Sequence, residues 1–82
     1  MPYIKQEKRE WFDPLLMAMI PDDLGELTYC IYILCAGYIS RKGMRYENIA
    51  GVAGSLTCTI QELYRRLAVP YEDSKIQENG DV

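Results

Sequence analysis

The chain has 82 residues, of which 49% are hydrophobic and 26% charged, and this length accommodates one small domain. It contains no histidine, three cysteines and a formal net charge of −3, which excludes histidine-based catalysis and most zinc sites. The acidity also argues against a DNA-binding surface, which needs clustered Lys and Arg. We therefore expect a non-enzymatic protein with no metal, cofactor or nucleic-acid partner.

The first twenty residues predict two short helices. Asp13 followed by Pro14 is typical of a helix N-cap with proline at the first helical position. This pattern predicts one short helix up to Phe12, a break, and a second from Pro14 to Ile20. Trp11 and Phe12 either attach this segment to the helical core or anchor a partner, and the first interpretation is favoured. The charges near the N-terminus disfavour a secretion signal, so we expect a cytoplasmic protein.

A long helix is expected to begin after Pro21. Asp23 and Glu26 have the spacing of a capping box, and apolar residues then recur every three or four positions up to Ile39. The other faces of this segment are apolar as well, so it needs more cover than one helix of a small chain provides. We therefore predict a homo-oligomer, either a dimer or a tetramer. The nearly uncharged run 27–39 is shorter than the roughly 20 residues of a bilayer span, so no membrane association is expected.

A second long helix is expected from about Tyr46 to Val69, after a turn at Gly43. The predicted fold is therefore all-α, with short N-terminal helices followed by a long antiparallel helical hairpin in an oligomeric bundle. Pro70 is expected to end the second helix. Residues 1–70 then form one helical domain, and residues 71–82 an acidic C-terminal tail. The cysteines are expected to be reduced core residues, and they are Cys30, Cys35 and Cys58.

Arginine and tyrosine occur together at two places, around the turn at 41–46 and near the end of the second long helix. Guanidinium groups bind phosphate and tyrosine rings stack on bases, so one interpretation is an anion or nucleotide site. Helix capping and ordinary surface charge form the other interpretation. The candidate ligand-binding residues are Arg65, Arg66, Tyr64, Tyr71, Arg45 and Tyr3.

Several segments carry a resemblance that spans nearly the whole chain. They are residues 1–10, 25–29, 62–66, 70–73 and 75–82, with the sequences MPYIKQEKRE, GELTY, ELYRR, PYED and KIQENGDV. Together they resemble a family of small phage and prophage proteins whose motifs carry no assigned chemistry. The resemblance implies a viral, intracellular, helical protein made in a bacterium.

Two functions follow from these observations as alternatives. By size, source and composition the chain is similar to the oligomeric phage sponges that bind cyclic nucleotides between protomers and withhold them from the CBASS and Thoeris immune systems. The first hypothesis is therefore sequestration of a cyclic nucleotide, such as a cyclic dinucleotide, without cleavage. The alternative is a small phage protein that inhibits or regulates a host protein by direct contact. Trp11, Phe12 and the acidic tail would then provide the binding surface.

Overall fold

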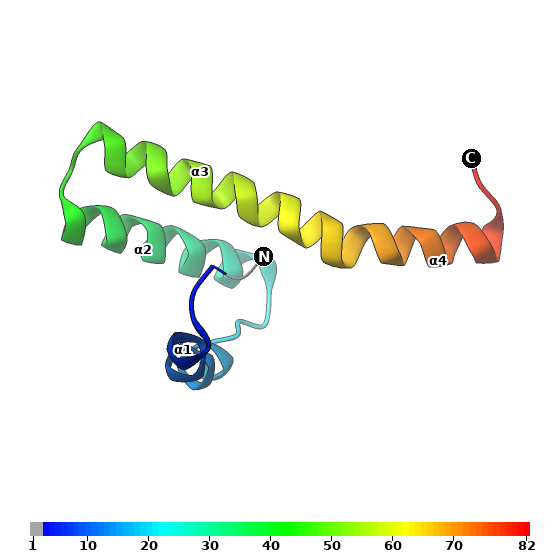
Figure 1. The fold of residues 1–82 in the computed structure, drawn as a ribbon, viewed down its shortest axis with the longest axis horizontal. Coiled ribbons are helices and arrows are strands. Elements are labelled where there is room, and N and C mark those ends of the chain that lie inside the picture. Colours follow the sequence, from blue (N-terminus) through cyan, green and yellow to red (C-terminus); the bar gives the residue numbers. More distant parts are fainter. Residues whose placement is uncertain (1–2) are drawn as a thin grey trace. The chain divides into compact units, whose positions relative to one another are not determined.

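The computed structural model describes residues 3–82, and every regular element in that range is helical (Figure 1). The prediction of an all-α fold is confirmed. The chain divides into two compact units, Met1–Ala36 and Gly37–Val82, which are described in turn.

The first unit begins with a single helix, α1 (Gln6–Ala18), which follows Lys5 as its N-cap and contains Pro14. The prediction of two short helices with a break before Pro14 is therefore wrong. Proline removes one backbone donor, which leaves the carbonyl of Glu10 without its usual partner. Because the residues on both sides are mostly strong helix formers, the helix continues despite the loss of this one hydrogen bond. It ends at Met19, whose N–H donates to the carbonyl oxygen of Leu16 at 3.0 Å.

Helix α2 (Leu24–Lys42) begins at the predicted capping box. Asp23 Oδ1 accepts a hydrogen bond from the backbone N–H of Glu26 at 2.8 Å, and Glu26 Oε1 accepts one from the N–H of Asp22 at 2.9 Å. Two donors at the start of the helix are thereby satisfied. The predicted start of the long helix is confirmed, with the return hydrogen bond one residue before the expected position.

A short turn separates the end of α2 from α3 (Tyr46–Leu63). Gly43 has a φ of +124°, a conformation that favours glycine, and its N–H donates to the Ile39 carbonyl at 2.8 Å. The Gly43 carbonyl accepts from the side-chain amide of Asn48 at 2.8 Å and from the N–H of Arg45 at 2.9 Å. Both the glycine at the helix end and the start of the next helix near Tyr46 are confirmed.

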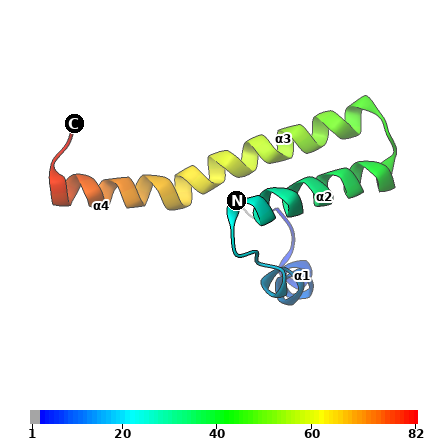
Figure 2. The same cartoon turned by 180° about the vertical axis from the view of Figure 1, so that it is seen from behind.

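The helix that begins at Tyr46 does not end at Pro70. It continues through η1, a π-helical turn (Tyr64–Ala68), into α4 (Val69–Asn79), so that residues 46–79 form one run of 34 residues (Figures 1 and 2). The prediction that Pro70 terminates the helix is wrong, and most of the supposed tail is helical. Helix α4 ends at Gly80, which has a φ of +83° and donates its N–H to the Ile76 carbonyl at 2.8 Å.

The π-helical turn has a physical cause in Pro70. Proline has no N–H to donate to the carbonyl of Arg66, and in a regular α-helix its ring would clash with that carbonyl. The turn before it is instead widened, and the N–H of Val69 donates to the carbonyl of Tyr64, five residues earlier. The wide turn takes up one extra residue, so α4 is rotated by about 100° relative to an unbroken α-helix.

Within residues 3–82, no side chain is buried. The apolar residues of α2 lie on every face of the helix and are exposed in the single chain, and they include Leu24, Leu27, Tyr29, Ile31, Tyr32, Ile33, Leu34 and Tyr38. The cysteines carry no disulfide: Cys30 and Cys35 are half-buried and Cys58 is exposed. None of the three is buried, so within the single chain they do not form the core residues that the sequence predicted.

Candidate functional site

Arg65 and Arg66 converge on one carboxylate, that of Glu62. Arg65 Nη2 donates to Glu62 Oε1 at 2.7 Å, and Arg66 Nε donates to the same oxygen. The spacings of three and four residues bring these side chains together on one side of the helix. Both guanidiniums stabilise the ionised form of Glu62 and lower its pKa to about 2. The arginine pair is therefore held in place and partly neutralised by the chain's own carboxylate.

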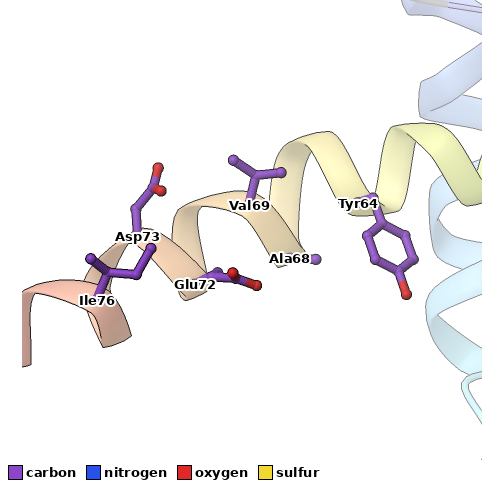
Figure 3. A pocket seen from close by; sticks show the side chains of 6 residues that line it. All are labelled: Tyr64, Ala68, Val69, Glu72, Asp73 and Ile76. Atoms are coloured by element: carbon purple, nitrogen blue, oxygen red, sulfur yellow. The ribbon is translucent and has the colours of Figure 1, made fainter. Parts of the chain in front are cut away.

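Tyr64 lies on a different side of the helix from this cluster, because adjacent residues in a helix do not face each other. Its ring lines a shallow groove along η1 and α4 (Figure 3). The groove has a volume of about 230 Å³ and is lined by Tyr64, Ala68, Val69, Glu72, Asp73 and Ile76. Apart from two carboxylates its walls are apolar, so the tyrosine faces negative charge where a nucleotide would require positive charge.

Tyr71 is placed beside a lysine. The Nζ atom of Lys75 lies 5.6 Å from the centre of the Tyr71 ring, which is within the range of a cation–π contact. Both residues border a second groove along α4 that ends at Val82. The tyrosine is well exposed, with 64% of its surface accessible, and its face can accept a planar group or an apolar side chain.

Of the other two candidate residues, Arg45 lies in the same compact unit but away from this region. Arg45 is the N-cap of α3 and pairs with Glu47 at 3.2 Å. Twenty residues of helix separate it from Arg65, which corresponds to about 30 Å. Tyr3 belongs to the other compact unit and is exposed. Of the six predicted residues, the structure therefore gathers Tyr64, Arg65, Arg66 and Tyr71 in two turns of helix, on more than one face.

A second exposed feature lies on α1. The rings of Trp11 and Phe12 meet edge to face with their centroids 4.8 Å apart. With Glu7 and Lys8 they line a wide groove of about 510 Å³. Trp11 keeps 64% of its surface exposed, so the pair presents a large rigid apolar surface of the kind found at the centre of protein interfaces.

Sequence reasoning missed the carboxylates that define this region. Glu62 precedes Arg65 and Arg66 by three and four residues, and this spacing was already visible in the segment ELYRR. The roles of Glu72 and Asp73 depend on the π-helical turn, which sets the side of the helix on which they lie. In a regular α-helix Asp73, nine residues after Tyr64, would lie on the opposite side of the helix.

Neither a cluster of metal-ligand side chains nor a membrane-spanning helix is present in the described part of the chain. Within residues 3–82, no three or more Cys, Asp or Glu side chains are grouped as metal ligands. In the same range, none of the helices combines the length and apolarity that a bilayer span requires.

Comparison with known sequence families gives one match. Residues 1–82 match the family described as a domain of unknown function (DUF6899), and the chain belongs to that family. No curated protein and no solved structure matches the chain.

Proposed function

We propose that this chain is a non-catalytic binding protein that works as a homo-oligomer in the cytoplasm of a bacterial host. The observation that carries the proposal is the lack of any buried side chain in residues 3–82, although 49% of the sequence is hydrophobic. Large apolar side chains remain exposed on every helix, among them Trp11, Tyr29, Leu34, Ile60 and Tyr71. Because burial of apolar surface is the main favourable contribution to folding and association, these side chains favour cover by a further copy.

The fold class suggests how copies assemble. In this proposal α2 and α3, which are joined by the short turn at 43–45, pack as an antiparallel hairpin. The hairpin covers one face of each helix, and the remaining apolar faces of α2 are covered by a second hairpin. A dimer or tetramer of hairpins is the expected product.

We propose a host protein as the partner of this oligomer, which makes the chain a phage-type inhibitor or regulator. Two features support a protein partner. Trp11 and Phe12 form an exposed aromatic pair on α1. The groove beside Tyr64 carries two carboxylates, which disfavour a phosphate-bearing ligand there.

A second candidate function is sequestration of a cyclic nucleotide without cleavage. The observation that favours it is the arginine pair in η1, since π-helical turns often mark functional sites and two guanidiniums there could bind phosphate. Tyr64 and Tyr71 add exposed rings for stacking. These groups lie on different faces of one helix, so a nucleotide site would have to be completed by a second copy.

Assembly is tested first. Sedimentation velocity and thermal unfolding are measured over a hundredfold range of protein concentration. A dimer or tetramer whose Tm rises with concentration is expected, because association stabilises only the folded chains. A monomer with a concentration-independent Tm would contradict the oligomer and with it the proposed function.

The ligand class is tested on the same preparation. Native mass spectrometry is recorded with a panel of cyclic di- and trinucleotides and cyclic ADP-ribose isomers. Binding of a fixed number of intact nucleotides per oligomer, reduced in Arg66→Ala, would establish the second candidate function. If no nucleotide binds, capture from host lysate is compared for wild type, Trp11→Ala and the surface control Glu78→Ala. A stoichiometric host protein that is lost only with Trp11→Ala is the expected result for a protein partner.

A further inference from the structure

The charges on either side of Val69 are arranged symmetrically along the helix. Arg65 and Arg66 lie four and three residues before Val69, whereas Glu72 and Asp73 lie three and four residues after it. With a rise of about 1.5 Å per residue, the two charge groups are roughly 4.5 to 6 Å on either side of Val69. A helix with this pattern is complementary to an antiparallel copy of itself.

The side chains at the ends of this pattern share one side of the helix. Val69 and Asp73 are four residues apart, and Figure 3 shows both on the same border of the Tyr64 groove. Arg65 and Asp73 are eight residues apart, and the π-helical turn takes up one of these residues. The remaining seven correspond to about two turns of helix, so Arg65 and Asp73 lie on the same side of it, with Val69 between them. Val69 itself keeps about half of its surface exposed, and Ile76 extends the apolar part of that face.

An antiparallel pair with the two Val69 side chains at its centre would bring opposite charges of the two copies together. Each Arg65 would lie opposite Asp73 of the other copy, and the same contact would occur twice because the arrangement has two-fold symmetry. The two carboxylates in the groove explain why a cationic surface fits there and an anion does not. Glu62 can keep its contacts with the arginines, because each guanidinium has five N–H donors.

We propose that this face of η1 and α4 is a self-complementary docking surface whose occupant is the same face of a second copy of the chain. The inference rests on the proposed homo-oligomer and deepens it by assigning one of its interfaces. Reciprocal pairing of Arg65 with Asp73 fixes the antiparallel register, and Val69 marks the two-fold axis.

The test uses two charge reversals in the full-length chain, Arg65→Glu and Asp73→Lys, separately and mixed in equal amounts. Each variant alone faces two symmetry-related repulsions, so its dissociation constant is expected to rise about tenfold or more. In the mixture Glu replaces Arg65 on one chain and Lys replaces Asp73 on the other, so both contacts are again attractive. Sedimentation velocity and native mass spectrometry should then show a mixed oligomer with near wild-type affinity.

Controls separate this inference from the proposed function. Arg41→Glu and Asp81→Lys make the same charge changes outside this face and should leave assembly unchanged. Far-UV circular dichroism reports whether each variant remains helical. If Arg65→Glu loses helicity, the dissociation constant of Asp73→Lys alone tests the docking surface. A wild-type oligomer that is insensitive to both reversals, or variants that stay dissociated when mixed, would overturn this docking surface only. A monomeric wild type would overturn the oligomer as well.

Discussion

Replacement of Pro70 by alanine should stabilise the helix and weaken self-association at the same time. Alanine restores a backbone donor and removes the ring that clashes with the Arg66 carbonyl, so a regular α-helix can replace the π-helical turn. The helix should gain up to about 3 kcal/mol, the difference between proline and alanine in a helix interior. For a chain of this size each kcal/mol corresponds to roughly 4–8 °C in Tm.

The loss of association follows from the geometry of the turn. Removal of the extra residue turns α4 by about 100°, because one residue of an α-helix corresponds to that rotation. Asp73 is then rotated by about 100° around the helix axis relative to Arg65. The two side chains no longer share one side of the helix, and the reciprocal ion pairs cannot form. The two copies then lack the charge pairs that set their antiparallel register, although no charge has been changed.

Two measurements test this prediction together. Helix stability is followed by circular dichroism during thermal unfolding, at concentrations where the chains are dissociated, and association by sedimentation velocity. Pro21→Ala is the matched control, because Pro21 lies outside the helices and is expected to change neither quantity. Tighter association of Pro70→Ala together with its higher Tm would refute the role assigned to the π-helical turn.

Three further changes test other parts of the structure. Asp23→Ala removes the side-chain cap of α2 and should cost about 1 kcal/mol, measured by urea unfolding with Asp22→Ala as the control. Gly43→Ala places a side chain at a φ of +124° and should cost more than about 1 kcal/mol in the same assay. The pKa of Glu62 is about 2 in the folded chain against about 4.5 without its partners, so the unfolded chain takes up its proton first as the pH falls. The stabilisation of the helix by ionised Glu62 is therefore complete above pH 4.5 and is lost towards pH 2. In an acid titration followed by circular dichroism at 222 nm, the wild type should lose helical signal over this range, and Glu62→Gln should lack that loss.

Much of the helix pattern was predictable from the sequence because it depends on local chemistry. The capping box at Asp23 and Glu26 satisfies donors within one turn, and Gly43 supplies a conformation that few other residues adopt. Such signals act over three to five residues and can be read directly. They fixed the start of α2 and the turn before α3.

Two of the errors concern proline and share one cause. At Pro14 and Pro70 the sequence predicted an end or a break, and in both places the helix continues. A proline removes one hydrogen bond, but good helix formers on both sides can outweigh that loss. At Pro70 the chain adds a widened turn, which changes the faces of all later residues. The candidate site could therefore be predicted by residue type near Arg65, but not by the side on which Tyr64, Glu72 and Asp73 lie.

Three threonine hydroxyls donate hydrogen bonds to backbone carbonyls one turn earlier in the same helix, so these hydroxyls have an acceptor before any interface forms. Thr57 Oγ1 donates to Ala53 and Thr59 Oγ1 to Ser55, at 3.0 and 2.8 Å, and Thr28 Oγ1 does the same to Leu24 in α2 at 2.8 Å. A buried hydroxyl without a partner would cost about 1–3 kcal/mol. Another helix can therefore cover these positions with apolar side chains alone, and association needs no matching polar group from the partner.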